Sequence, residues 1–290
     1  MTPIQRPLLG GRRRWALAAI VLAGAWAWAR LDLGLAGLYP REGGLRIARD
    51  FLSAALSPAL DYEALPPGAG TESFAGRLAV ALLHTVLYAA AALALAVPPG
   101  LVLALLSSSS WWSQDPLVSG VSQRLGDGAR GGLRSLVRLF IAALRSIHEL
   151  LWAVLFLAAM GVSSATAVLA LAIPLTGTLA KVYSEILDEA DGRGERGVRA
   201  VGASGVASFL VGRLPAALPD MAAYTFYRFE CATRTAAILG FFGFPTIGYA
   251  LRASFEESHY HEVWSYTYAI LALVLLLESW SACLRKRYVA

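Results

Sequence analysis

Six ionisable side chains interrupt two long apolar stretches of the chain. Charged groups are costly inside a membrane, so they usually face a bundle interior or a water-filled cavity and mark a transport pathway. Guanidinium groups bind the oxygens of phosphate-like anions, and neighbouring carboxylates keep such binding weak. The six residues therefore predict a translocation pathway for a small oxyanion. They are Arg145, His148, Glu149, Arg228, Glu230 and Arg234.

A structural role is the alternative for the same residues. Arg145 and Glu149 are four positions apart, so a continuous helix would place them on one face, where they could pair. Arg228 and Glu230 are two positions apart and would not face each other on a straight helix. Internal ion pairs could therefore fix helix packing while the solute meets only weakly interacting walls. Both interpretations stay open on the sequence alone.

The elements that hold these residues are expected to be membrane-spanning helices. The chain is 57% hydrophobic and 16% charged, whereas a soluble domain is about half apolar and a quarter charged. A helix needs about 20 apolar residues to cross a bilayer. Apolar runs at 15–29, 78–106, 136–160, 165–183, 216–239 and 264–284 predict an all-α, polytopic transmembrane bundle of about six spans.

The first apolar run has two interpretations. Basic residues precede it, and Ala25, Trp26 and Ala27 resemble a signal-peptidase site, which is typical of a cleaved signal peptide. Trp26 and Trp28 instead suit the interfacial belt of a retained span. We favour the span, because apolar character continues weakly to Tyr39.

Basic residues predict the orientation. An even number of spans places both termini on one side, and basic residues lie near both ends, at 6, 12–14 and 285–287. Four arginines also lie between positions 193 and 213. Because Lys and Arg accumulate in cytoplasmic segments, we expect both termini and this segment in the cytoplasm.

A polar segment at 194–219 separates the fourth and fifth predicted spans. Residues 195–203 can form a short helix with Val198 and Val201 on one side and Arg196 and Arg199 on another. Gly202 would let the backbone turn or a partner approach closely. The segment is thus predicted to be a cytoplasmic docking site, although an amphipathic turn at the membrane surface would show similar polarity.

This segment resembles the cytoplasmic loop of importer permeases of the ATP-binding-cassette (ABC) class. In that family, the loop helix docks into a cleft on a separate ATPase subunit, and a glycine makes the turn. The chain departs from the family pattern at Arg196 and Gly197, where Ala-Leu or Ala-Ala is usual. The resemblance implies an ATPase-coupling role for Glu195, Ala200, Gly202, Ala203, Ser204, Leu214 and Pro215.

Two further segments resemble phosphonate-type permeases of this class. Residues 145–153 match their third span, with His148 in place of the usual proline, and residues 224–248 match their fifth span and the glycine-rich turn after it. That turn departs from the family at 243–248. Together the three segments carry the resemblance over roughly 78–251. Because both departures lie near the expected solute path, the substrate stays open.

The resemblance also implies the surroundings of the chain. It predicts a type I ABC importer permease fold in the inner membrane, with residues 1–77 as an N-terminal anchor and external segment and 78–290 as the permease domain. The chain would be no enzyme, because a separate ABC ATPase subunit hydrolyses ATP. A periplasmic binding protein would deliver phosphonate or a related oxyanion, and a second permease copy would complete a homodimer in the lipid bilayer.

Two other functions compete with this prediction. One is an importer permease for another oxyanion or an amino acid. The other is a rhomboid-like intramembrane serine protease, because the stretch from Gly202 to Gly205 matches the nucleophile pattern of that family. Such a protease needs Ser204 inside an apolar span and a histidine within hydrogen-bond reach. Ser204 instead follows a charged segment, and His259 and His261 lie in a polar stretch.

Several classes of ligand are not expected. The histidines and the two cysteines, Cys231 and Cys283, show no metal-ligand spacing, and no nucleotide-binding loop or cofactor motif occurs. The net charge of +5 is not arranged as a basic stripe interleaved with aromatic residues, so no nucleic acid partner is predicted.

Overall fold

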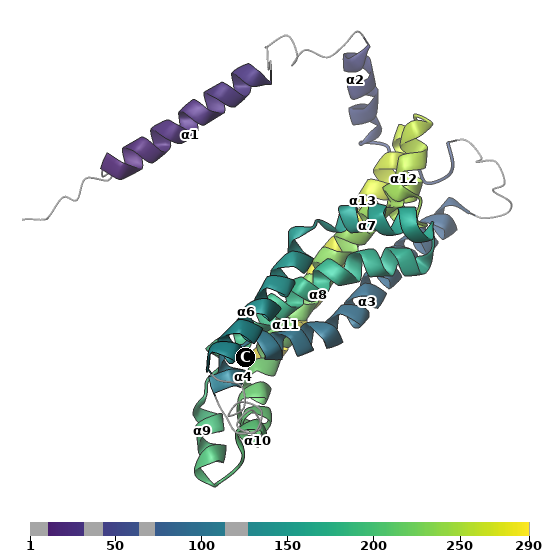
Figure 1. Ribbon diagram of the computed structural model, residues 1–290. Helices are drawn as coiled ribbons and strands as arrows, with labels where there is room; N and C mark the ends of the chain where they lie inside the picture. Colours follow the sequence, from purple (N-terminus) through teal and green to yellow (C-terminus); the bar gives the residue numbers. More distant parts are fainter. Residues whose placement is uncertain (1–10, 32–42, 64–72, 114–126, 290) are drawn as a thin grey trace, which may run out of the picture. The chain divides into compact units, whose positions relative to one another are not determined.

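The computed structural model describes residues 11–31, 43–63, 73–113 and 127–289. All regular secondary structure within these ranges is helical, which confirms the predicted all-α fold (Figure 1). The elements are α1 (Gly11–Arg30), α2 (Gly44–Ala54), α3 (Phe74–Ser107), α4 (Ser109–Ser113), α6 (Asp127–Ser146), α7 (Glu149–Met160), α8 (Ser164–Glu189), α9 (Arg193–Ala200), α10 (Gly205–Ser208), η2 (Phe209–Arg213), α11 (Leu214–Ile238), η3 (Leu239–Phe242), α12 (Ile247–Glu256) and α13 (Tyr260–Val289).

The chain separates into two units, Met1–Ser53 and Ala54–Ala290. The first contains α1 and most of α2. In the second, the segment after α2 is held against α13: the backbone N–H of Ala59 donates to the carbonyl of His261 at 3.2 Å, and that of Glu63 donates to the Glu262 carboxylate at 2.8 Å. The basic positions 6, 12–14 and 285–287, on which the predicted orientation rests, lie outside the described side chains.

The core of the second unit forms where α3 packs along α8, with α11 against α3 and α13 against α11 (Figure 1). Small residues of α3 make this packing close, because Ala89, Ala92 and Ala96 are fully buried. At Gly100 a Cβ atom would lie 3.2 Å from the Cβ of Leu179. The helices α6 and α7 also pack against α8, and α6 contacts α3 as well.

The candidate spans number three to five within the described residues. Phe74–Ser107, Ser164–Glu189 and Tyr260–Cys283 are long and apolar enough to cross a membrane. Two bent pairs also qualify if each counts as one span: Gly131–Ser146 with Glu149–Met160, and Gly205–Phe242 with Ile247–Glu256. The first predicted span, in α1, has a shorter apolar part, Trp15–Arg30.

The predicted continuous helix at 136–160 is wrong, because the chain bends by 81° between α6 and α7. His148 has extended backbone angles (φ −64°, ψ 144°), and its side chain accepts a hydrogen bond from the N–H of Leu150. This histidine therefore caps a new helix rather than continuing the old one. Arg145 and Glu149 consequently do not share a helix face, and no ion pair joins these two described residues.

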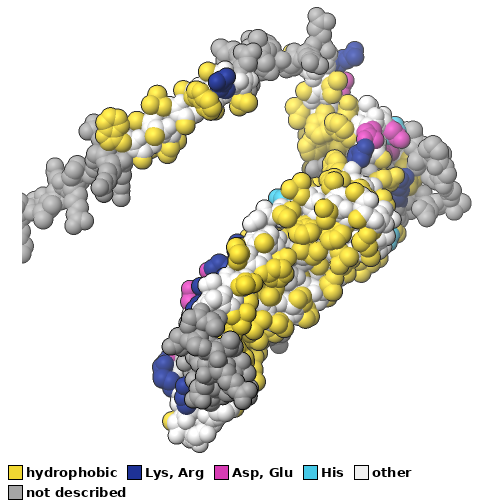
Figure 2. Space-filling view, viewed as in Figure 1, with side chains coloured by type: hydrophobic (Ala, Val, Ile, Leu, Met, Phe, Trp, Pro, Cys, Tyr) yellow, Lys and Arg dark blue, Asp and Glu magenta, His cyan; other side chains and the backbone are white. Residues whose placement is uncertain are grey.

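The described surface of the bundle is rich in apolar side chains. Leu83, Leu87 and Val102 of α3 and Leu275 and Leu276 of α13 are all more than half exposed. Figure 2 shows hydrophobic side chains over most of the visible bundle, while Lys and Arg side chains are visible at the end near α9. An apolar surface with charge toward its end suits a protein that spans a lipid bilayer.

Candidate functional site

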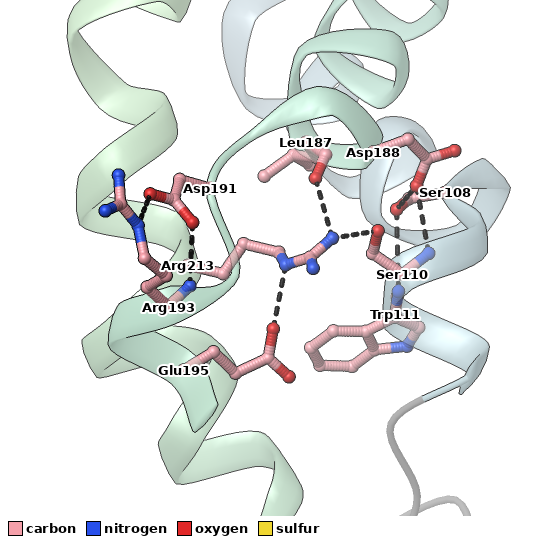
Figure 3. Close-up of polar contacts among 9 residues, drawn as sticks. All are labelled: Ser108, Ser110, Trp111, Leu187, Asp188, Asp191, Arg193, Glu195 and Arg213. Carbon is pink, nitrogen blue, oxygen red and sulfur yellow. Dashed lines mark hydrogen bonds and ion pairs between the residues drawn. The ribbon is translucent and has the colours of Figure 1, made fainter. Parts of the chain in front are cut away.

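The predicted coupling segment forms α9, α10 and η2, which connect α8 to α11 at one end of the bundle (Figure 1). Its central feature is a buried ion pair. Glu195 is 1% exposed, and its Oε2 accepts a hydrogen bond from the Nε of Arg213 at 2.8 Å (Figure 3). The pair joins α9 to η2, so it sets the distance between the two arms of the segment.

Arg213 also ties the segment to the bundle. Its Nη1 donates to the carbonyl of Leu187 at 3.2 Å, near the end of α8, and to the hydroxyl of Ser110 in α4 (Figure 3). One guanidinium group therefore contacts α8, α4 and α9. Any displacement of α9 must move or break these contacts.

Asp188 makes a second connection at the same end. Its carboxylate accepts hydrogen bonds from the hydroxyl of Ser108 at 2.6 Å and from the backbone N–H groups of Ser109 at 3.1 Å and Ser110 at 2.9 Å. The junction of α3 and α4 is thereby fixed to α8. Figure 3 shows Asp188 and Arg213 approaching Ser110 from two sides.

Close backbone packing explains why a glycine follows the apolar part of η2. A Cβ atom at Gly212 would lie 2.5 Å from both the Cα and the N of Glu195, which real Cβ atoms do not tolerate. No sequence pattern indicates this contact, because Gly212 is distant from Glu195 along the chain. From the sequence alone, Arg213 is one of the basic residues that predict topology, and nothing in the pattern indicates that it pairs with Glu195.

An exposed interaction marks the start of α9. The backbone N–H of Arg193 donates to Asp191 at 2.9 Å, and its guanidinium group also pairs with the carboxylate. These contacts, led by the backbone hydrogen bond, hold the pKa of Asp191 below its usual value. The helix therefore begins beside a carboxylate that stays ionised, which suits the positive end of the helix dipole.

The other predicted coupling residues lie along the same connection. Gly202 has a φ of +88°, and its N–H donates to the carbonyl of Arg199 at 3.0 Å, so it turns the chain after α9. The hydroxyl of Ser204 accepts from the N–H of Ala207 at 3.3 Å and caps α10. Ala200 ends α9 and is exposed, Ala203 is half-buried in the turn, and Leu214 and Pro215 begin α11.

The serine protease arrangement is not formed. Ser204 is exposed and caps a helix, whereas His259 lies 3.3 Å from the Glu257 carboxylate and His261 lies beside Ser57. Ser204 therefore has neither histidine as a partner.

A cavity of about 240 Å³ lies between α6, α7, α8 and α11. It brings together four of the six predicted pathway residues, which come from the end of α6, the start of α7 and the middle of α11. Its charged and hydroxyl-bearing walls include Arg145, His148, Glu149, Thr178, Arg228 and Thr235.

Two arginines line the cavity, and one of them has an N–H group without a partner among the described residues. The Nε of Arg228 is buried and has no hydrogen-bond partner among the described residues. The Glu149 carboxylate contacts groups other than these arginines. It accepts a hydrogen bond from the hydroxyl of Thr235 at 3.2 Å and lies 4.0 Å from the Nε2 of His148. Arg228 and Arg145 can therefore offer N–H donors to an anion in the cavity.

Glu230 and Arg234 lie apart from this cavity. The Nη2 of Arg234 donates to the Oε1 of Glu230 at 2.9 Å, one helical turn away on α11. Glu230 is 8% exposed at its side chain and Arg234 is 51% exposed. This pair fits the structural alternative, whereas the four other residues line one cavity.

Comparisons with known proteins show what the chain is similar to. A family model described as "Binding-protein-dependent transport system inner membrane component" matches residues 128–288. The phosphite transport system permease protein PtxC of Stutzerimonas stutzeri is 31% identical over 71% of this chain and 70% of its own length. The putative cryptic phosphonate transport system permease protein PhnE2 of Escherichia coli (strain K12) is 33% identical over 42% of this chain and 99% of its own length.

A solved structure shares the fold. The crystal structure of an amino acid ABC transporter with histidines aligns with a TM-score of 0.60, covering 74% of this chain and 95% of the other. The two sequences are 16% identical, so the likeness concerns the fold alone. It confirms the predicted permease architecture.

Proposed function

Since the chain belongs to the family of binding-protein-dependent transport system inner membrane components, we propose that it imports a small phosphorus oxyanion by ATP-driven alternating access. The protein is a multi-pass permease subunit of the inner membrane. Its kinship with a phosphite and a phosphonate permease supports phosphite or a phosphonate as the solute class. The single observation that carries the proposal is the cavity lined by Arg145 and Arg228.

The energy for transport comes from a separate ABC ATPase subunit that docks on α9. Exposed residues of α9 and its turn, including Arg196, Gly197, Ala200 and Val201, offer the surface for that contact. Arg213 connects this surface to α8 and α4, so a push on α9 reaches the bundle through a short polar path. The predicted coupling residues from Glu195 to Pro215 act together in this role.

The solute path needs further partners. An external binding protein delivers the anion, and a second copy of the permease faces the first across the pathway in a homodimer. The cavity supports weak and reversible anion contact, because its lining includes the carboxylate of Glu149 as well as the two arginines. Weak contact is appropriate for transport, since a tightly held solute would not leave.

An uptake assay with the complete complex tests the proposal. The permease would be reconstituted in proteoliposomes with its ATPase and binding protein, and phosphite, methylphosphonate, phosphate and an amino acid would be compared. Arg228→Gln removes a cavity cation and should lower oxyanion uptake at least tenfold, which corresponds to about 1.4 kcal/mol. ATP hydrolysis should persist.

The matched control on the same helix combines Glu230→Gln with Arg234→Gln, because both residues lie outside the cavity lining and removing both charges leaves no buried charge unpaired. Its uptake should stay close to that of the natural sequence. Equal uptake by Arg228→Gln and the natural sequence would remove the cavity from the pathway, and preferential uptake of the amino acid would replace the solute class.

A further inference from the structure

A second cavity, of about 230 Å³, lies between α6 and α8 and is closer to the coupling segment. On α8 the first cavity extends to Thr178, whereas the second is lined by Lys181, Ser184 and Glu185. Thr178 and Glu185 are separated by about two helical turns, or roughly 10 Å along the axis. Since α8 leads directly into α9, the second cavity lies on the coupling side of the first.

The second cavity is also cationic. Arg138, Arg145 and Lys181 face a single carboxylate, that of Glu185. The Nε of Arg138 donates to the carbonyl of Ser107 at 3.3 Å, and its other N–H groups have no partner among the described residues. Lys181 is ion-paired with Glu185 one turn away, and both side chains are about half exposed. An anion entering this space would meet available donors.

Arg145 belongs to both cavities. Arg138 and Arg145 are seven positions apart on α6, so they lie on one helix face about two turns from each other. Between the cavities, α6 and α8 touch at Gly177, where a Cβ atom would lie 2.8 Å from the Cβ of Leu144 and 3.0 Å from the Cγ of Arg145. The Arg145 side chain therefore lies beside the helix contact that separates the two spaces.

We propose that the second cavity is a further binding site for a small tetrahedral oxyanion, occupied after the first, and that Arg145 passes the anion between them. This inference rests on the proposed function of the first cavity. Glu185 competes with the anion for Lys181, so an internal ion pair satisfies this lysine when the site is empty. The same competition keeps the bound anion exchangeable and favours its release.

Protection of a single cysteine from chemical labelling can report anion binding in each cavity separately. Cys231 lines the first cavity and serves as its native reporter, while Ala142→Cys places a reporter in the second. Cys283 would be replaced by alanine in both proteins, and Cys231 by alanine in the second. The full chain, with its ATPase in nanodiscs, would be treated with N-ethylmaleimide, whose neutrality avoids charge effects on the reaction rate.

Phosphite should slow the labelling of both reporters about tenfold at a concentration about ten times its Kd. Lys181→Gln should abolish the protection of Ala142→Cys and leave that of Cys231, whereas Arg228→Gln should do the reverse. Arg145→Gln should weaken both. Lys181→Arg keeps the charge and should restore protection, which separates anion binding from a loss of folding.

Protection at Cys231 without any at Ala142→Cys would overturn the second site and leave the proposed function standing. Unchanged protection of Ala142→Cys in Lys181→Gln would also overturn it. Absence of protection at both reporters would contradict the proposed function as well. Nanodiscs with and without phosphatidylglycerol separate a lipid headgroup from a free anion: protection that needs the lipid and ignores phosphite would overturn the inference.

Discussion

Glu195 shows how burial changes the interpretation of a motif residue. By sequence it opens a segment that resembles an ATPase-docking loop, where an exposed carboxylate could meet the partner directly. In the structure, Glu195 is 1% exposed and pairs with Arg213, which in turn contacts Leu187 and Ser110. Its contribution to coupling is therefore expected to be internal: it keeps α9 attached to the elements that α9 must move.

Glu195→Gln should destabilise the protein and uncouple transport. The change leaves the guanidinium group of Arg213, whose side chain is 12% exposed, without its charged partner. Breaking a buried ion pair on one side costs about 3–5 kcal/mol. We expect a lower thermal unfolding temperature in nanodiscs and ATP hydrolysis that no longer drives uptake.

Two variants make this prediction specific. Asp191→Asn removes the exposed carboxylate that pairs with Arg193 and should leave stability and uptake nearly unchanged. Combining Glu195→Gln with Arg213→Gln removes both charges and should restore part of the lost stability. A double variant less stable than the sum of the single effects would argue against a direct pair.

The apolar runs in the sequence predict where helices form better than they predict where a helix bends or stops. Runs such as 78–106 and 165–183 match α3 and α8 because long apolar segments must satisfy their backbone groups as helices in a membrane. The run at 136–160 is equally apolar, yet it bends by 81°. Histidine is no strong helix breaker, so the capping role of His148 could not be derived from residue type.

His148→Pro should be accepted at this bend. The φ of −64° at His148 already matches the angle that a proline ring imposes. Where the native angles fit, proline stabilises by about 0.4–1 kcal/mol through the unfolded chain, and loss of the side-chain cap offsets part of this gain. We expect an unfolding temperature within a few degrees of the natural sequence.

Val154→Pro is the contrasting variant in the same helix. Val154 lies exposed inside α7, where proline removes a hydrogen bond and costs about 3 kcal/mol. Thermal unfolding of the two variants should therefore diverge clearly. Similar losses for both would mean that the helix continues through residue 148.

The turn after α9 carries a prediction of its own. Gly202 has a φ of +88°, a conformation that costs a residue with a side chain about 1–2 kcal/mol. Because nothing lies within 4 Å of its missing Cβ, Gly202→Val should strain this turn without disturbing the bundle. We expect normal membrane insertion, uptake below a tenth of normal, which is about 1.4 kcal/mol of lost function, and uncoupled ATP hydrolysis.

Gly202→Asn is the matched control for the turn. Asparagine also adds a side chain where nothing lies within 4 Å, but it tolerates the positive φ of this residue better than valine. Uptake should therefore stay close to normal. If both variants lose uptake equally, added bulk at this position rather than turn geometry would be responsible.

For the whole molecule, composition and motif order were sufficient to predict the family, because bilayer length and the polar loop are local properties of the chain. The cavities were not predictable in the same way. Arg145, His148, Glu149 and Arg228 were named as candidates, but only packing shows that they share a space while Glu230 pairs elsewhere. The role of Arg138 and Lys181 depends entirely on how α6 meets α8.

The division into two units leads to a prediction for the entire chain. The buried apolar core of the described residues begins at Ala54, so the second unit holds this core within itself. Deleting residues 1–42 should therefore leave the thermal unfolding of the second unit within a few degrees of the full chain in nanodiscs.

Gly100→Leu provides the contrast within the core. Its Cβ would lie 3.2 Å from the Cβ of Leu179 and 3.4 Å from the carbonyl of Thr176, so a larger side chain would force α3 and α8 apart. Overpacking of this kind costs about 1–3 kcal/mol. One point change at this contact should thus lower the unfolding temperature more than the loss of 42 residues. The reverse order would mean that the bundle depends on the first unit for its stability.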